Sequence, residues 1–295
     1  MKLLMTLEQL RIFVGVAELE HVTAAARMLN ITQSTASAAI AALEERHGVK
    51  LFHRVGRNIV LTEEGQVFLE EARRVLAQAR SAEAVLDELN GLKRGTLRVV
   101  ASQTIAAYWL PAPLSAFRRQ FPGVTVDLKI GNTEQVAAHI REGQSDLGFI
   151  EGEIRDPLLA QWAVGEDRLH LVQAGVFKTR TVSATWLEKA PWIMRERGSG
   201  TRSCADDCLR KIGVRPENLE EFLVLPSNES VRTAVEAGFG IAALSSLVVA
   251  PAVAAGTLHI IPADLGTRTF FGLRHKERSP GKAATAFLSQ IEKTL

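Results

Sequence analysis

The sequence has few of the residues and runs that mark disulfide-bonded, secreted or membrane-spanning proteins. Only 2 of its 295 residues are cysteine, too few for a disulfide framework. Its longest apolar run, 241–255, is broken by Ser245, Ser246 and Pro251 and is shorter than the roughly 18 residues of a bilayer span. Residues 1–5 are too few for the apolar region of about 7–15 residues in a signal peptide. We therefore expect a cytoplasmic protein with reduced thiols and no membrane partner.

An excess of charge of one sign is also missing. The chain has 35 Lys and Arg against 33 Asp and Glu, a net charge of +2, and residues 1–66 carry seven of each kind. The distribution is nevertheless uneven, because residues 22–43 contain one charge, Arg27, whereas residues 46–62 contain no acid. An uncharged polar segment is thus followed by a cationic one. The length exceeds the typical domain of about 100–150 residues, so we expect two or three modules.

The first sixty residues carry the pattern of a helix-turn-helix. Apolar spacing predicts helices over 7–18, 23–29 and 33–46, with Thr6 and Thr32 as N-caps and Gly48 as the stop. Short helices joined by a tight turn are typical of this unit. A strand predicted at 58–61, after a basic turn, would form a β-wing behind it.

The third predicted helix has polar side chains suited to reading DNA. The first turns of this helix enter the major groove, where Gln pairs with adenine and Ser or Thr donate to bases or phosphates. Cations of the wing would meet phosphates, which gives affinity without sequence information. The alternative is that the hydroxyls only cap the helix and the cations are only solvated. The candidates are Thr32, Gln33, Ser34, Thr35 and Ser37 on the helix, with Lys50, Arg54 and Arg57 in and around the wing.

A long helix is predicted over 62–90, with Thr62 as its N-cap. Its apolar positions alternate spacings of four and three, which is the pattern of a coiled coil. An amphipathic helix lying on its own domain would show the same pattern. A helix of roughly 27 residues is about 40 Å long, however, and linkers rarely pack along their whole length. We therefore expect dimerisation through Phe68, Ala72, Val75, Ala79, Ala82, Leu86 and Leu89.

From residue 96 the sequence changes to alternating strands and helices. This βαβ rhythm implies a parallel sheet with helices on both faces, and two α/β lobes are the simplest account of about two hundred residues. The predicted strands are 96–100, 124–130, 146–150, 168–173, 192–194 and 222–225, and the predicted helices are 105–120, 133–142, 203–212 and 230–237.

The strand-to-helix turns of both lobes are rich in hydroxyls and amides. Open α/β sheets bind ligands at the carboxyl ends of strands, where helix N-termini offer free N–H groups. One such turn would be an ordinary helix cap, but four of them predict a cleft for a small, anionic ligand. Glu151 would gate the cleft or bond a protonated ligand; alternatively, it would pair with Arg195 or Arg197. The other candidates are Ser102, Gln103, Thr104, Asn132, Thr133, Ser199, Gly200, Thr201, Arg202, Asn228 and Ser230.

Catalytic and metal-binding patterns are missing from the sequence. The GSG around Ser199 is not G-x-S-x-G, there is no H-E-x-x-H, and the Gly-rich segment 195–202 lacks the spacing of a phosphate loop. Cys204 and Cys208 form only a weak C-x-x-x-C pattern, so we expect inert thiols instead of a redox pair or metal ligands. We expect no catalysis, no metal and no cofactor. The alternative is an α/β enzyme that uses the loop 195–204 and turns over without residues 1–92.

The N-terminal motifs resemble those of LysR-type transcriptional regulators. The resemblance is carried by the run LEQLRIFVGVAELEHVTAAARMLNITQSTASAAIAALEERHGVKLFHRVGRNIVLTEEG and covers nearly the whole chain. It implies a multi-domain protein with a winged helix-turn-helix at 1–64, a long coiled-coil linker helix at 65–92, and an α/β, two-lobed effector domain at 93–295 that is similar to periplasmic binding proteins. Lobe I is expected at about 93–167 and 266–295, and lobe II at about 168–265.

The resemblance also assigns residues by position. It places Gln33, Ser34 and Ser37 in the groove, and Arg54 and Thr62 at the DNA backbone or the adjoining minor groove. Ala38 departs from the family's pattern, because many relatives have a long basic residue there. We therefore expect recognition to rely more on Gln33, Ser34 and the shape of the DNA.

Partners follow from the resemblance as well. It implies a dimer on an interrupted palindrome of double-stranded DNA, a tetramer that bends the DNA, and contact with RNA polymerase at activated promoters. The strings ASQTIAAYWLP, DLGFIEG and RERGSGTR resemble a LysR subgroup linked to sulfur metabolism and carbon fixation, which favours a small inorganic oxyanion or small carboxylate as effector. The alternative is a cytoplasmic small-molecule sensor that acts through protein partners without sequence-specific DNA binding.

Overall fold

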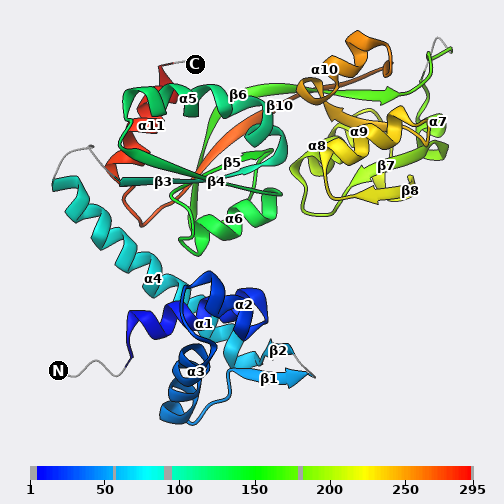
Figure 1. Ribbon diagram of the computed structural model, residues 1–295. Helices are drawn as coiled ribbons and strands as arrows, with labels where there is room; N and C mark the ends of the chain where they lie inside the picture. Colours follow the sequence, from blue (N-terminus) through cyan, green and yellow to red (C-terminus); the bar gives the residue numbers. More distant parts are fainter. Residues whose placement is uncertain (1–4, 56–57, 90–94, 179–181, 294–295) are drawn as a thin grey trace. The chain divides into compact units, whose positions relative to one another are not determined.

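The computed structural model describes residues 5–55, 58–89, 95–178 and 182–293. The chain divides into two compact units, which Figure 1 shows in blue to cyan and in green to red. The first unit contains Met1–Leu86 with Glu142–Gln144, and the second contains Asp87–Arg141 with Ser145–Leu295. Within the described ranges, no helix is long and apolar enough to cross a membrane.

The first unit is a winged helix-turn-helix. The predicted caps are confirmed: Thr6 forms a capping box with Gln9, Thr32 accepts a hydrogen bond from the N–H of Thr35 at 3.1 Å, and Gly48 ends the third helix with φ +66°. The elements are α1 (Leu7–Leu19), α2 (Val22–Met28), α3 (Gln33–His47), the antiparallel strands β1 (Phe52–Val55) and β2 (Asn58–Leu61), and α4 (Glu63–Leu89).

Small side chains allow these helices to pack closely. Ala25 of α2 and Ala36 of α3 are both fully buried in one hydrophobic cluster. A second cluster joins α4 to α1, where the rings of Phe13 and Phe68 lie 4.8 Å apart. The N-terminus of α4 approaches the chain before β1 so closely that a Cβ on Gly65 would collide with the carbonyl oxygen of Leu51. This contact explains why glycine stands three residues after Thr62.

The second unit contains a six-stranded sheet with the order β4-β3-β5-β10-β6-β9. The prediction of a parallel sheet is wrong for three of the five strand pairings: β3 runs parallel to β4 and β5, whereas β10 runs antiparallel to β5 and β6, and β6 to β9. The strands are β3 (Gly95–Ser102), β4 (Val124–Gly131), β5 (Leu147–Glu151), β6 (Leu159–Gln173), β9 (Ala242–Ser245) and β10 (His259–His275).

The hydrophobic core of this unit is divided between two lobes, and the long strands β6 and β10 contribute to both. One part contains Phe149 and Phe270, and the other contains Trp192 and Leu209. We call the first part lobe I and the second lobe II. Lobe I has the helices η1 (Ile105–Trp109), α5 (Pro111–Gln120), α6 (Thr133–Arg141) and α11 (Lys282–Glu292). Lobe II has α7 (Ala184–Lys189), α8 (Gly200–Lys211), η2 (Pro216–Asn218), α9 (Asn228–Glu236), α10 (Ser246–Ala255) and the parallel strands β7 (Pro191–Arg195) and β8 (Glu220–Leu225).

One predicted helix of lobe I is interrupted. Residues 105–120 form the π-helical turn η1 and then α5, because Pro111 has no N–H to continue the first segment and is suited to a helix start. In lobe II, the helix predicted from residue 203 starts earlier, at Gly200. Its N-terminus therefore lies in the Gly-rich turn, next to the residues that the sequence marks as ligand contacts.

Candidate nucleic-acid interface and effector cleft

The first turns of α3 present an exposed polar face. The opposite face of the helix is buried and contains Ala36, Ile40 and Leu43. The exposed face contains Gln33, Ser34 and Ser37. The hydroxyl of Thr32 is occupied locally, since it caps α3 and lies 2.8 Å from the hydroxyls of both Ser34 and Thr35. Gln33 and Ser37, two of the predicted base contacts, are thus exposed on this face.

One cation of the stretch that follows α3 is paired with a carboxylate of α3. The Nζ of Lys50 lies 2.7 Å from one carboxylate oxygen of Glu44. The other oxygen accepts hydrogen bonds from the N–H groups of Leu51 at 2.9 Å and Phe52 at 3.3 Å. Burial favours a raised pKa for Glu44, but these donors outweigh it and lower the pKa. Lys50 therefore has a fixed carboxylate partner that its place in the sequence does not reveal. Arg54, on β1, is exposed.

Thr62 is a structural residue, contrary to its predicted role at the DNA backbone. Its side chain is 4% exposed, and its hydroxyl donates to the carbonyl oxygen of Lys50 at 2.7 Å while it accepts from the N–H of Gly65 at 2.8 Å. The hydroxyl thus caps α4 and ties it to the chain before β1. Arg57, another predicted contact, lies outside the described residues.

The predicted dimerisation positions on α4 divide into two groups. Phe68 and Ala72 pack in the core of the winged helix-turn-helix, where Ala72 is 1% exposed and out of reach of a second chain. The prediction is wrong for Ala72, because the apolar spacing continues onto the face of α4 that packs against α1; Phe68 is half-buried against the ring of Phe13 and stays a predicted contact. Val75 is 44% exposed, Ala79 is half-buried and Ala82 is exposed. The side chains of Leu86 and Leu89 lie outside the described residues.

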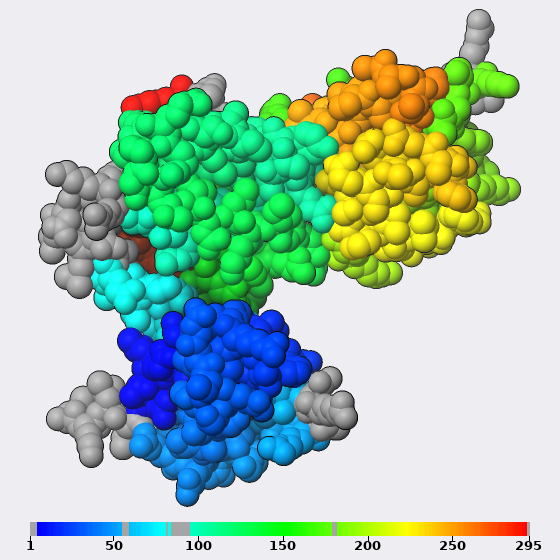
Figure 2. Space-filling view, viewed as in Figure 1, coloured from blue at the N-terminus to red at the C-terminus, as the bar shows by residue number. Residues whose placement is uncertain are grey.

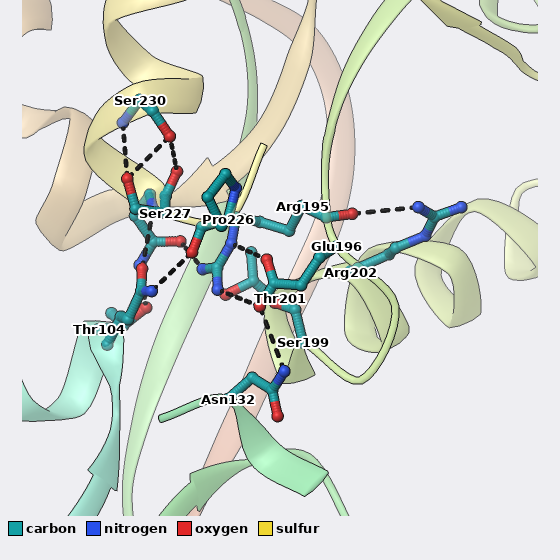
Figure 3. Close-up of polar contacts among 12 residues, drawn as sticks. Thr104, Asn132, Arg195, Glu196, Ser199, Thr201, Arg202, Pro226, Ser227 and Ser230 are labelled. Atoms are coloured by element: carbon teal, nitrogen blue, oxygen red, sulfur yellow. Dashed lines mark hydrogen bonds and ion pairs between the residues drawn. The ribbon is translucent and has the colours of Figure 1, made fainter. Parts of the chain in front are cut away.

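In the second unit, turns from the two lobes bond directly to each other (Figure 3). The amide of Gln103 donates to the carbonyl oxygen of Pro226 at 2.8 Å and accepts from the N–H of Asn228 at 3.0 Å. The side-chain amide of Asn228 donates to the hydroxyl of Thr104 at 2.9 Å, and its oxygen accepts from Arg195. Figure 2 shows the yellow surface of lobe II against the green surface of lobe I. The predicted turns therefore meet, and they hold the lobes together.

A buried ionic cluster lies beside these turns. Arg268 of β10 bonds to Asp167 of β6 through Nε at 2.9 Å and Nη2 at 2.8 Å, and to the hydroxyls of Thr201 at 3.0 Å and Thr104 at 3.4 Å. Glu151 lies 3.9 Å from Arg268. The side chains of Glu151 and Arg268 are each 2% exposed. The partner of Glu151 is thus Arg268, and not Arg195 or Arg197 as in the alternative prediction.

Two buried hydroxyls in the same region have no hydrogen-bond partner. They belong to Ser102, at the end of β3, and Thr133, at the start of α6. A Cβ on Gly200 would collide with the Thr133 hydroxyl and lie 3.0 Å from a carboxylate oxygen of Glu151. Ser199, the N-cap of α8, makes no side-chain capping bond. The N-terminus of α8, with its positive dipole end, therefore faces unsatisfied polar groups of lobe I.

Three other predicted contacts are engaged elsewhere. Arg202 donates to the carbonyl oxygen of Arg195 at 3.1 Å and pairs with Glu221 of β8, away from Thr104 (Figure 3). Ser230 bonds only within the α9 cap, where its hydroxyl lies 2.8 Å from that of Ser227. Asn132 caps α6 and donates to Glu196 of lobe II over a long 3.4 Å. Of these three, only Asn132 joins the lobes.

The two cysteines lie in surroundings that disfavour their thiolate forms. Burial raises the pKa of Cys204 to about 11 and raises that of Cys208 as well. Both are free thiols. In the described part of the chain, no group of three or more His, Cys, Asp or Glu could hold a metal ion.

Sequence reasoning missed Asp167 and Arg268 at the lobe junction and considered Arg195 only as an alternative partner of Glu151. Asp167 and Arg268 lie in strands that cross both lobes, and Arg195 ends β7. Each is a charged residue with 4–6% exposure. A single charge at the end of an apolar strand, as in PWIMR, is the signal that could have identified Arg195.

The geometry agrees with comparisons to known proteins. Residues 7–66 match the family "Bacterial regulatory helix-turn-helix protein, lysR family", and residues 90–295 match "LysR substrate binding domain". The chain is 34% identical over 291 residues to the uncharacterized HTH-type transcriptional regulator YeiE of Escherichia coli, covering 97% of each protein. It is 32% identical to a probable RuBisCO transcriptional regulator of Trichormus variabilis, covering 97% of this chain and 87% of that protein.

Solved structures share the fold. Full-length CbnR in complex with its target DNA is similar with a TM-score of 0.67 at 22% identity, covering 99% of this chain and 100% of that one. The regulatory domain of Synechocystis CcmR in complex with 2-PG is similar with a TM-score of 0.61 at 24% identity, covering 68% of this chain and 97% of that one.

Proposed function

Because the chain belongs to the LysR family of DNA-binding transcriptional regulators, we propose that a small anionic effector, bound between its two lobes, modulates its DNA binding or promoter activation. One observation carries this proposal: a set of buried polar side chains, with two unpartnered hydroxyls, lies where the lobes meet. Native proteins rarely leave buried hydroxyls unpaired unless a ligand or water completes them. The cleft is therefore suited to a ligand rich in hydrogen-bond acceptors.

The charge and size of the effector follow from the same groups. The N-terminus of α8 and the guanidinium of Arg268 favour negative charge. Gly200 lies so close to Thr133 and Glu151 that little volume remains between them. These features support a small inorganic oxyanion or a small carboxylate more than an aromatic acid.

The lobes offer a mechanism for signalling. Gln103 and Thr104 of lobe I already bond to Asn228 of lobe II, so a ligand that joins these contacts changes the free energy of lobe closure. It alters DNA binding only to the extent that its affinity differs between the two lobe arrangements. The effector would thereby reset the spacing of the paired DNA-binding domains.

We further propose that the chain binds DNA as a dimer. Two copies of α3 would then enter successive major grooves of an interrupted palindrome, with the exposed side chains of Gln33 and Ser37 towards the bases. Val75, Ala79 and Ala82 of α4, continued by the predicted positions Leu86 and Leu89, would form the seam between copies. A tetramer that bends the DNA, contact with RNA polymerase at activated promoters, and a cytoplasmic location, where the target DNA lies, complete the proposal.

The proposal is tested with genomic fragments selected on the full-length chain. Their affinity for the protein is measured with and without sulfate, sulfite, phosphate, glycolate and benzoate, and the melting temperature is recorded in parallel. A bound anion should stabilise the fold by RT ln(1 + [L]/Kd) and shift DNA affinity or footprint. A response to benzoate alone would contradict the small-anion proposal, and no response to any ligand would contradict effector control by this cleft.

A further inference from the structure

Arg268 is the charged residue on which the lobe junction converges. Its side chain is 2% exposed, its guanidinium lies 5.8 Å from the ring centroid of Phe270, and it comes from β10, which crosses both lobes. It bonds to Thr104 of lobe I, Thr201 of lobe II and Asp167 of the crossing strand β6. Arg268 therefore contacts residues of both lobes.

We propose that Arg268 binds the anionic group of the effector and is the residue that makes the cleft select an oxyanion or carboxylate. This inference rests on the proposed function of the cleft. A guanidinium has five N–H donors in a planar fork. Asp167 takes the Nε edge, Thr201 takes one donor of Nη1 at 3.0 Å, and Thr104 is reached only at 3.4 Å. A second Nη1 hydrogen and the weak Thr104 bond leave donor capacity for a ligand oxygen.

Asp167 acts as a positioning residue for this fork. One of its oxygens accepts from Nε and Nη2 of Arg268, and the other accepts from the hydroxyl of Ser246 at 3.0 Å. The carboxylate is thereby fixed on both sides and holds the guanidinium in one plane. A fixed fork binds an oxyanion with less loss of conformational entropy than a free arginine.

Glu151 occupies the place that the ligand would take. At 3.9 Å its carboxylate attracts Arg268 by charge but is beyond hydrogen-bond distance, and it lies next to Gly200 at the N-terminus of α8 and next to the unpartnered hydroxyl of Thr133. An effector oxygen at hydrogen-bond distance from Arg268 would replace this weaker contact. It would also give the hydroxyl of Thr133 a partner.

The neighbouring arginines are committed elsewhere. Arg195 forms a forked pair with Glu196, through Nε at 2.8 Å and Nη2 at 2.9 Å, and its remaining group bonds to Asn228. Arg202 is paired with Glu221 on the far side of α8. Arg268 also has a carboxylate partner, Asp167, but it alone of the three bonds to hydroxyls of both lobes, Thr104 and Thr201. Its position between the lobes makes it the better candidate, although the sequence favours the Gly-rich loop.

The test compares two matched charge-pair replacements in the full-length chain. Arg268→Gln with Asp167→Asn removes the proposed anion ligand together with its nearest carboxylate, so that only Glu151, 3.9 Å from Arg268, stays buried without its arginine. Arg202→Gln with Glu221→Gln removes the control pair in lobe II. Calorimetric titration with sulfate, phosphate and glycolate gives Kd for each protein, and circular dichroism checks the fold.

We expect the first double variant to lose anion affinity by on the order of 10- to 100-fold, which corresponds to a charged hydrogen bond, and the control to change by less than about threefold. Equal affinity of the first variant and the wild type would overturn the role of Arg268 and leave the proposed function standing. Absence of anion binding by the wild type would overturn both. If the first variant does not fold, Arg268→Lys decides: it keeps the charge but loses the fork, so unchanged affinity would refute the inference.

Discussion

Asn228 links the two lobes through its side chain, and its removal should loosen them. Its side chain is 3% exposed and makes two bonds, one from the charged Arg195 and one to Thr104 across the lobe boundary at 2.9 Å. A charged hydrogen bond contributes about 1.5–3 kcal/mol and a neutral one about 1 kcal/mol. Asn228→Ala should therefore cost about 3 kcal/mol, since both former partners stay buried.

The matched control is Ser230→Ala in the same helix, because Ser230 bonds only to Ser227 and its loss should cost about 1 kcal/mol or less. In a domain of roughly 200 residues, 1 kcal/mol shifts the melting temperature by about 2–4 °C. Calorimetry should therefore show a decrease of about 6–12 °C for Asn228→Ala and about 2–4 °C for Ser230→Ala. Equal decreases would refute the assignment of Asn228 as a link between lobes.

Three further predictions concern single residues. The lowered pKa of Glu44 means that its carboxylate stabilises the fold above the ordinary glutamate pKa and that this contribution is lost as pH falls through the lowered value. The urea midpoints of Glu44→Gln and of the wild type should therefore converge in acid. A constant difference between the two midpoints down to about pH 3 would contradict the contact with Lys50. Gly65→Ala should destabilise the first unit by about 1–3 kcal/mol, because the new Cβ meets the carbonyl oxygen of Leu51; an unchanged urea midpoint would disprove this close approach. Cys204, with its pKa raised to about 11, should be alkylated by iodoacetamide at pH 8 roughly 100-fold more slowly than in the urea-unfolded chain, and equally fast labelling would contradict its burial.

Local signals explain why the DNA-binding unit was predicted well. Thr6 and Thr32 as caps, and Gly48 as a stop, act within a few residues of themselves, so the sequence determines them directly. The dimer contacts on α4 were harder to predict, because an apolar spacing of three and four residues shows that one face of the helix is apolar but not which surface packs against it. Phe68 is covered by Phe13, more than fifty residues earlier.

The cleft shows the same division between local and distant information. The turns at Gln103 and Asn228 were recognisable as hydroxyl- and amide-rich helix starts, and the structure brings them together. Arg268 and Asp167 were missed because they are 101 residues apart and meet only through the pairing of β10 with β6. The antiparallel course of these two strands, which places one guanidinium between two lobes, has no signature in local periodicity.

Sequence-selective DNA binding by the exposed face of α3 is tested most directly by a salt titration of Gln33→Ala with Ser37→Ala against the wild type. Affinities for a selected genomic fragment and for random DNA give the specificity ratio and the salt slope. We predict that the ratio falls by on the order of 10- to 100-fold, as expected for lost base contacts, while the slope stays unchanged because no phosphate-binding cation is removed. An unchanged specificity ratio in a folded variant would contradict the account.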